Sequence, residues 1–479
     1  MLRAALTKIR RFPPGVKASI AFFFSSIVTK GIAYITTPIY TRMLSSEEYG
    51  QVSVYLTWLQ IFGIIAMFCL SYGVFNNGMI DYPDKRDDYS FSMLIFSNVI
   101  TLCFTAALFC LYPLVGNYLR IGWQLMLLMC VVFFFQPAYN FWVARQRYEY
   151  KYKAVLFFSI LCAIVSPLTA LFLMWIAPFG ERLYPRIFGA ELSLIAIYIL
   201  FYVYLGHKNC WKVNTKYWKM AFLFNLPLIP HYLSTYLLGS SDKIMISYLI
   251  GDSATAFYSV AYSVAAIATI IWSAMNSSLV PYTYEKCKVG DYGAINKVTL
   301  PLLSLFAVGC FLVTMMAPEV IWIMATDDYM EAMYVIPPVV GGVFFQVQYH
   351  IYANVVYYFK KPRWVMAGSL FAVAVNILLN FFCIKQWGYI AAGYTTLICY
   401  IIQAAIDYFA AKKVVGKSVY NIRIILALSL LVVAASLTCG LLYNHPFIRY
   451  SLVLTILALI FLFKNRIARI FSFKKKNNE

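Results

Sequence analysis

The chain has 479 residues, of which 62% are hydrophobic and only 12% are charged. A soluble globular domain has about 25% charged residues, so this composition excludes a water-soluble protein built of several domains. The formal net charge of +20 does not indicate a nucleic-acid partner, because the Lys and Arg residues form short clusters between apolar segments, where they act as topology signals.

The apolar segments predict an all-α polytopic membrane protein with twelve to fourteen transmembrane helices. A span needs about twenty apolar residues to cross about 30 Å of hydrocarbon. The first six candidates are 18–40, 52–75, 91–115, 121–143, 154–177 and 187–205. The next six are 220–239, 254–282, 298–317, 333–358, 365–384 and 389–411. A last pair follows at 424–443 and 447–463, and its second member is short, which leaves the count open.

The N-terminus resembles a signal peptide only at first sight. Five basic residues precede the first apolar run: Arg3, Lys8, Arg10, Arg11 and Lys17. The run continues to Tyr40 without a small-residue cleavage site, so the pattern favours a retained first span.

The distribution of basic residues predicts that both termini are cytoplasmic. With the N-terminus inside, the strongly basic loops also fall inside, and most of the 39 Lys and Arg residues are then cytoplasmic. These loops are 145–153, 208–219, 360–363 and 412–423, followed by the tail 464–476. The outer loops are short, so none can present the acid and base groups of a membrane enzyme. We therefore expect no catalytic residues, no metal and no cofactor.

Two similar stretches predict an internal repeat. Tyr49 to Tyr55 resembles Ala256 to Tyr262 at an offset of about 207 residues, which corresponds to six predicted spans. An even number of spans per repeat gives two halves of the same orientation, related by an axis along the membrane normal. We expect an N-terminal six-helix lobe (1–206) and a C-terminal six-helix lobe (207–413) around a central cavity. Residues 414–479 would form an extra helix pair and a basic cytoplasmic tail.

Lys30 is the clearest charge inside a predicted span. A charged side chain near the bilayer centre costs about 2.5 to 3.5 kcal/mol, so it needs a functional or structural reason. Lys30 lies on one helical face with other polar residues, namely Ser19, Ser26, Thr37 and Thr41. The pattern favours a substrate-binding lysine. The alternative is a structural lysine paired with a buried carboxylate or with carbonyl oxygens.

Charged residues end the first and the seventh predicted spans. Arg42 closes the first, and Asp242 with Lys243 closes the seventh. We expect these residues to line the mouth of a cavity that accepts an anionic substrate, although such positions also suit ordinary interfacial anchors. Prolines in the same spans, Pro38 in the first and Pro227 and Pro230 in the seventh, predict bends.

Two acidic residues within predicted spans are candidates for coupling to an ion. Glu191 and Asp407 could exchange a proton or bind sodium. Each also lies about five residues from a basic residue, Arg186 and Lys412 respectively, so interfacial pairing is the alternative interpretation.

Three groups of residues resemble a known family. The first is the stretch from Thr37 to Gly50, with the sequence TPIYTRMLSSEEYG. The second combines Asp242 to Ile246 with the following Leu-Ile-Gly and the Ala256 to Tyr262 stretch, and the third is Asn380 followed by Gly388 and an Ala-Ala-Gly. From about Val16 to Lys413 the chain resembles the polysaccharide-export branch of the multidrug/oligosaccharidyl-lipid/polysaccharide flippase superfamily, the Wzx-type O-antigen and capsule flippases.

The resemblance implies two six-helix lobes that rock around a central cavity. It also implies transport of undecaprenyl-pyrophosphate-linked oligosaccharide repeat units from the inner to the outer leaflet of a bacterial plasma membrane. A polysaccharide polymerase and a chain-length regulator would be its partners, besides the lipid substrate and membrane lipid. The similar peptidoglycan-precursor flippases often have fourteen spans, so that substrate stays an alternative. A cation-coupled multidrug exporter of the same superfamily is another.

Overall fold

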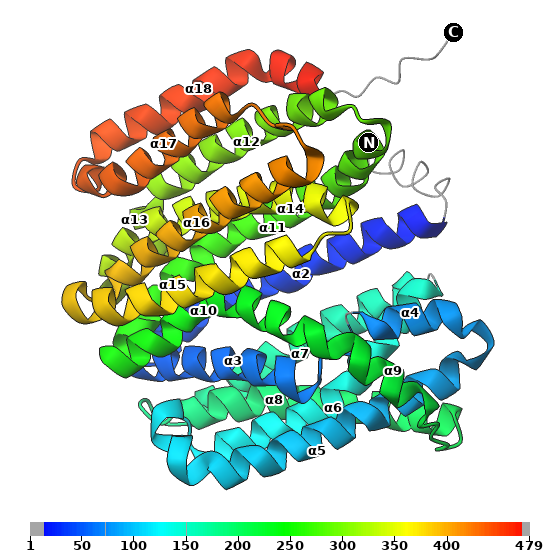
Figure 1. Ribbon diagram of the computed structural model, residues 1–479. Helices are drawn as coiled ribbons and strands as arrows, with labels where there is room; N and C mark the ends of the chain where they lie inside the picture. Colours follow the sequence, from blue (N-terminus) through cyan, green and yellow to red (C-terminus); the bar gives the residue numbers. More distant parts are fainter. Residues whose placement is uncertain (1–13, 72, 150, 472–479) are drawn as a thin grey trace, which may run out of the picture. The chain divides into compact units, whose positions relative to one another are not determined.

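The computed structural model of the protein describes residues 14–71, 73–149 and 151–471 (Figure 1). All regular structure in these ranges is helical, which confirms the predicted all-α fold. The basic residues before Pro14 and the end of the basic tail lie outside the described residues.

The chain forms two compact units, Met1–Ala256 and Phe257–Glu479, and each is described by itself. The helices of the first unit are α2 (Pro14–Met43), α3 (Ser46–Ala66), α4 (Val74–Asp81), α5 (Arg86–Leu119), α6 (Trp123–Tyr148), α7 (Tyr152–Ile176), α8 (Leu183–Lys208), α9 (Lys216–Asn225) and α10 (Ile229–Leu249). Short 3-10 turns, η1 (Pro83–Lys85) and η2 (Leu226–Leu228), precede α5 and α10.

The second unit begins within α11 (Asp252–Val289), a helix that starts in the first unit. It continues with α12 (Tyr292–Met315), α13 (Ala317–Met324), η3 (Asp327–Val335), α14 (Ile336–Tyr358), α15 (Arg363–Trp387), α16 (Ile390–Val415), α17 (Ile422–Thr438), η4 (Cys439–Leu442) and α18 (Pro446–Phe471). The extra helix pair expected after residue 413 is therefore present as α17 and α18, which lie beside α12 (Figure 1).

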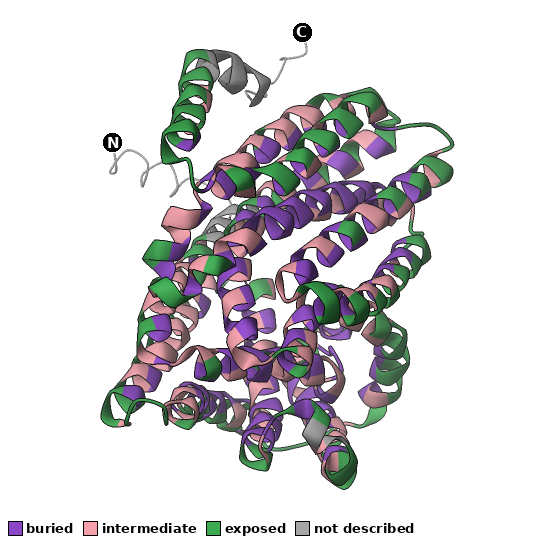
Figure 2. Ribbon diagram, turned by 90° about the vertical axis from the view of Figure 1, so that its left-hand side faces the viewer, coloured by how far each residue is buried: buried purple, intermediate pink, exposed green. Residues whose placement is uncertain are grey.

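Within the described residues, 10 helices are long and apolar enough to cross a membrane. They include α5 to α8 in the first unit and α11, α12 and α14 to α17 afterwards. The remaining predicted spans coincide with α2, α3, α9 with α10, and α18, which are helical but are not among the 10, so the count of twelve to fourteen stays a prediction. Buried and exposed positions alternate along most helices (Figure 2), and many exposed residues are large and apolar, as lipid contact requires.

The second predicted span is broken, so the continuous helix expected over 52–75 is wrong. Helix α3 ends at Ala66, and Phe68 and Cys69 adopt left-handed backbone conformations with φ of 55° and 51°. The amide Nδ2 of Asn225 donates a hydrogen bond to the carbonyl oxygen of Phe68 at 2.9 Å, which satisfies a backbone group freed by the break. The chain resumes as the short α4.

The three prolines singled out in the sequence differ in whether they interrupt a helix. Pro227 lies in the 3-10 turn η2 and Pro230 in the first turn of α10, so the seventh predicted span is interrupted at the prolines for which the sequence predicts a bend. Pro38 lies inside α2, which continues to Met43, so the first span is not interrupted there.

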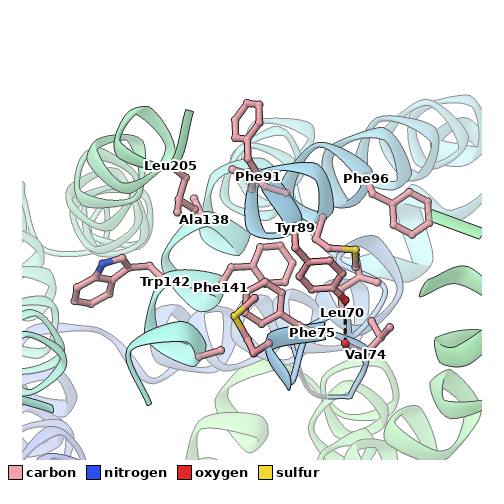
Figure 3. Packing of buried hydrophobic residues seen from close by; sticks show 14 of the residues in the cluster. Leu70, Val74, Phe75, Tyr89, Phe91, Phe96, Ala138, Phe141, Trp142 and Leu205 are labelled. Atoms are coloured by element: carbon pink, nitrogen blue, oxygen red, sulfur yellow. Dashed lines mark hydrogen bonds between the residues drawn. The ribbon is translucent and has the colours of Figure 1, made fainter. Parts of the chain in front are cut away.

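Aromatic side chains build the core of the first unit (Figure 3). Phe75 of α4 stacks on Phe141 of α6 with ring centroids 4.5 Å apart. Tyr89 of α5 is fully buried, and its hydroxyl donates to the carbonyl oxygen of Val74 at 2.9 Å. This cluster joins the short α4 to α5, α6 and α8, which compensates for the break before it.

Two structural features support the internal repeat. Helices α8 and α16 each have 26 residues, and both of their ends differ by 207 positions. Ser46 and Ser253, which also differ by 207 positions, are hydrogen bonded through their hydroxyl groups at 3.1 Å. The boundaries at residues 206 and 413 stay a proposal.

Candidate functional site

The turn between α2 and α3 fixes the start of α8. Ser45 donates its backbone N–H to Glu48 Oε2 at 2.9 Å, and Glu48 donates its N–H to Ser45 Oγ at 3.2 Å, which is a capping box. The other carboxylate oxygen of Glu48 accepts the backbone N–H groups of Arg182 and Leu183, at 2.5 and 3.2 Å. The Arg182 guanidinium also donates to the carbonyl oxygen of Met43 at 2.7 Å. One buried carboxylate therefore caps two helices and holds α8 against the end of α2.

A cavity of about 420 Å³ lies in the first unit between α2, α6, α7 and α8. Its α2 side is formed by residues at helical spacing: Thr29, Ala33, Thr36 and Tyr40. Helix α8 contributes Arg186, whose guanidinium carbon lies 4.0 Å from the centroid of the Tyr40 ring. The remaining polar lining includes Ser159 and Ser166 of α7 with Tyr139 and Tyr198 of α6 and α8. We call this cavity the Arg186 pocket.

The predicted substrate-binding face of α2 is not the face that lines the Arg186 pocket. Lys30 is exposed, and it lies about a quarter turn away from the pocket-lining residues of the same helix. Arg42 is also exposed, and its Nη1 donates to the carbonyl oxygen of Pro38 at 2.9 Å. Both residues therefore stay candidates on the surface of α2. From the sequence, Arg186 is expected only as a possible partner of Glu191 and not as a binding residue.

Asp242 and Lys243 lie within α10, in the first unit. Asp242 is fully buried and Lys243 is half-buried, so the pair is not a simple exposed anchor at a helix end. The carbonyl oxygen of Lys243 accepts the hydroxyl of Thr255 at 3.4 Å, which ties α10 to the first turn of α11.

The two candidate acids are buried in different units. Glu191 lies in α8 of the first unit, and Asp407 lies in α16 of the second. The described residues contain no ion pair between Glu191 and Arg186 or between Asp407 and Lys412, so the interfacial pairing considered from the sequence is not formed. Neither carboxylate oxygen of Asp407 has a hydrogen-bond partner among the described residues, and nor does Oε1 of Gln403 one turn earlier.

Asparagine side chains join α15 to α16. Asn380 donates to Asn376 Oδ1 at 3.1 Å, and Asn376 donates to Thr396 Oγ1 at 3.2 Å. The hydroxyl of Thr395 donates in turn to Asn380. These hydrogen bonds hold the two helices together, as polar side chains do in membrane bundles.

A second cavity, of about 530 Å³, lies in the second unit between α12, α14, α17 and α18. Its lining is mostly apolar, with residues such as Phe311, Val340, Leu431 and Ile460, and it also includes a few Ser and Thr residues. We call it the apolar groove. No charged side chain lines it among the described residues, so the groove favours an apolar occupant.

A bidentate ion pair holds α18 beside the apolar groove. Arg449 of α18 donates to both carboxylate oxygens of Glu319 in α13, at 2.5 and 2.6 Å, and also to the carbonyl oxygen of Met315. Burial would raise the pKa of the Glu319 carboxyl, but hydrogen bonds from Arg449 and Tyr450 hold that pKa below its ordinary value. Tyr443 adds a hydrogen bond to the carbonyl oxygen of Thr314 at 3.0 Å.

A family model described as "Polysaccharide biosynthesis protein" matches residues 16–285, more than half of the chain. The chain belongs to this family. The "Lsg locus putative protein 1" of Haemophilus influenzae is 22% identical over 424 residues, which cover 83% of this chain and 98% of that protein. The Wzx-type resemblance is therefore confirmed at the level of the family.

Two solved structures show the same fold. The lipid II flippase MurJ in an inward closed conformation aligns with a TM-score of 0.65 and 14% identity, covering 94% of this chain and 100% of that one. An inward-facing multidrug resistance MATE family transporter aligns with a TM-score of 0.61 and 11% identity, covering 83% and 98%. This member of the family is thus a multi-pass membrane protein with the fold of flippases and transporters.

Proposed function

We propose that this protein flips undecaprenyl-pyrophosphate-linked oligosaccharide repeat units from the inner to the outer leaflet of the bacterial plasma membrane. The product would serve capsule, exopolysaccharide or O-antigen synthesis. Both termini would be cytoplasmic, and a polysaccharide polymerase with a chain-length regulator would act on the exported units. The protein would move its substrate without altering its covalent bonds.

The observation that carries the proposal is the apolar groove in a member of a polysaccharide biosynthesis family. A polyprenyl chain is a long apolar group, and a groove lined by apolar side chains of four helices offers it a partner surface. The sugar and pyrophosphate need polar and cationic contacts, and the first unit contains both in the Arg186 pocket and on the surface of α2. Lys30, Arg42, Asp242 and Lys243 stay proposed substrate contacts.

We propose that a proton or a sodium ion resets the carrier, with Glu191 or Asp407 as its binding residue. Asp407 is the better supported of the two, because its buried carboxylate has no hydrogen-bond donor among the described residues. An isolated buried carboxylate is strongly unfavourable unless a cation or a proton neutralises it.

The test is reconstitution of the purified protein in liposomes. Outward movement of a fluorescent undecaprenyl-pyrophosphate oligosaccharide should exceed that of the peptidoglycan precursor lipid II and that of a cationic drug. An Ala435→Trp variant, which fills the apolar groove, should slow transport of the lipid-linked sugar, while the exposed Leu430→Trp on the same helix should not. Preferential transport of lipid II would assign the protein to the peptidoglycan-precursor class, and preferential drug export would assign it to the exporters.

A further inference from the structure

Two residues that line the Arg186 pocket each carry a buried polar atom that has no hydrogen-bond partner among the described residues. These atoms are the hydroxyl of Tyr40, whose residue is 6% exposed, and Nε of Arg186. We propose that the pocket binds the carboxylate of an acidic sugar, presented by the oligosaccharide part of the transported lipid. The inference rests on the proposed function only for the identity of the molecule that carries this sugar.

The unpaired atoms define the chemistry of the ligand. Nε of arginine is a donor only, and a tyrosine hydroxyl can donate a hydrogen bond as well. A buried donor without an acceptor costs free energy. A ligand oxygen that accepts hydrogen bonds from both atoms removes this cost, so these bonds add more to the free energy of binding than bonds to solvated donors would. Because the guanidinium carbon lies 4.0 Å from the Tyr40 ring centroid, both donors belong to one small region.

The charge of the pocket favours an anion over a neutral acceptor. Arg186 is the one Lys, Arg, Asp or Glu among the described lining residues. Glu191, the nearby carboxylate on the same helix, forms no ion pair with Arg186 in the part of the chain that the structure describes. Glu191 and Arg186 attract each other across a longer distance, but no carboxylate is hydrogen bonded to the guanidinium in the described residues. The guanidinium can therefore form hydrogen bonds with an oxyanion, which are stronger than those with a neutral oxygen.

The rest of the lining suits a sugar better than a bare phosphate. Thr29, Thr36 and Ser166 add hydroxyl groups, and Tyr139 with Ser159 forms a hydroxyl pair 3.2 Å apart. Such groups can both donate to and accept from sugar hydroxyls, and tyrosine rings offer flat surfaces to the C–H faces of a pyranose. The volume of about 420 Å³ lies in the range of small-ligand sites.

The pocket is also built on fixed elements. Thr169 of α7 donates to the carbonyl oxygen of Gly189 in α8 at 2.8 Å. A Cβ atom at Gly189 would lie 2.8 Å from Cα of Ala170, so only glycine permits this close helix contact. Together with the double cap at Glu48, the contact fixes Arg186 relative to α2 and α7.

The experiment measures binding of small probes to the full-length protein in nanodiscs by saturation-transfer NMR. The probes are glucuronic acid, glucose and inorganic phosphate. Glucuronic acid should bind more tightly than the other two. Arg186→Gln should weaken its binding about tenfold or more, and Tyr40→Phe should weaken it by a smaller factor. The control is Arg147→Gln, an exposed arginine that also lies over an aromatic ring but outside the pocket, and it should bind like the wild type.

Any of the following results would overturn the proposal that the pocket binds a sugar carboxylate. Equal binding of glucose shows that no oxyanion site exists, and tighter binding of phosphate assigns the pocket to a lipid phosphate group. Absence of glucuronic acid binding, or equal binding by the Arg186 variant, removes the site. Thermal unfolding gives an independent check, because the Tyr40 hydroxyl has no described partner and Tyr40→Phe should leave the unfolding temperature unchanged or raised. None of these measurements requires transport, so failure of the flippase proposal would be seen separately.

Discussion

Glu48 joins two helix ends through a single side chain. Its two oxygens accept three backbone N–H groups, and its own N–H is capped by Ser45. We predict that Glu48→Ala lowers the free energy of unfolding by about 1 to 3 kcal/mol, because it leaves buried donors without acceptors. Ser45→Ala, which removes one cap contact, should cost about 1 kcal/mol.

Thermal or denaturant unfolding in detergent measures both effects. The matched control is Glu47→Ala, an exposed neighbour whose loss should change stability by less than about 0.5 kcal/mol. Equal destabilisation by the Glu47 and Glu48 variants would contradict the double-cap interpretation.

Lys30 is the residue for which the sequence made the sharpest functional prediction. Its side chain is exposed on α2, where it can meet an anionic substrate. We predict that Lys30→Ala abolishes export while the protein stays in the membrane, and that Lys30→Arg keeps part of the activity, because the positive charge is retained with a different geometry. Surface polysaccharide is the measurement, with protein abundance in the membrane fraction as its control. Full export by Lys30→Ala would show that the charge is not used.

At the residue scale, sequence reasoning finds local motifs and misses distant partnerships. The Ser45-x-x-Glu48 pattern has the spacing of a capping box, and the structure shows that the box is formed. The second role of Glu48 depends on Arg182, which is far along the chain. The sequence predicts Arg186 only as a possible partner of Glu191, because its contact with Tyr40 exists only once α8 is placed against α2.

The ion pair between Glu319 of α13 and Arg449 of α18 holds α18 in place as one of the four helices that line the apolar groove. Arg449 is 3% exposed, so removing its carboxylate partner leaves a buried charge uncompensated. We predict that Glu319→Gln lowers stability by about 3 to 5 kcal/mol, whereas Asp328→Asn, at an exposed acid nearby, changes it little. Limited proteolysis of the α17–α18 segment and thermal unfolding measure the effect. Unchanged protease resistance in Glu319→Gln would show that other contacts hold α18.

The ion pair between Glu319 and Arg449 also makes the stability of the folded protein depend on pH. The pKa of Glu319 is lowered in the folded protein, so its contribution to stability is present above the ordinary glutamate pKa of about 4.3. That contribution is lost as the pH falls through the lower folded value. The Glu319→Gln variant should therefore lose less stability than the wild type over this acidic range.

At the scale of whole elements, apolar length predicted where helices lie, and it did not predict where they break. The interruption after α3 falls at Phe68 and Cys69, which carry neither the freedom of glycine nor the constraint of proline. Tertiary contact, including the Asn225 hydrogen bond, stabilises the turn instead. The interruption at Pro227 was predictable because proline removes a backbone donor.

The orientation of the whole molecule in the membrane rests on its basic loops. We predict that cysteine accessibility mapping finds loops 208–219 and 360–363 on the cytoplasmic side and the 319–331 segment outside. Single cysteines at exposed positions in these loops, introduced into a protein whose exposed native cysteines have been replaced, give the measurement. The opposite labelling pattern would invert every span and contradict both the topology and the direction of transport.

The family and the fold were predictable at the largest scale, because hydropathy and the Thr37–Gly50 motif extend over many residues. The substrate was not, because its recognition depends on a few side chains from separate helices. The Arg186 pocket takes residues from four helices, and no stretch of sequence brings them together.

The charge of the proposed substrate predicts which force drives its transport. A pyrophosphate is anionic and the bacterial interior is negative, so outward movement is favourable by about 2.3 kcal/mol per charge per 100 mV. The empty carrier must then return, and a proton or sodium ion at Asp407 would assist that step. We predict that collapsing the potential in proteoliposomes slows outward transport more than removing the pH gradient does, and that Asp407→Asn slows multiple turnovers more than the first one. Transport that persists without a potential but stops without a proton or sodium gradient would replace the electrical mechanism with coupled antiport.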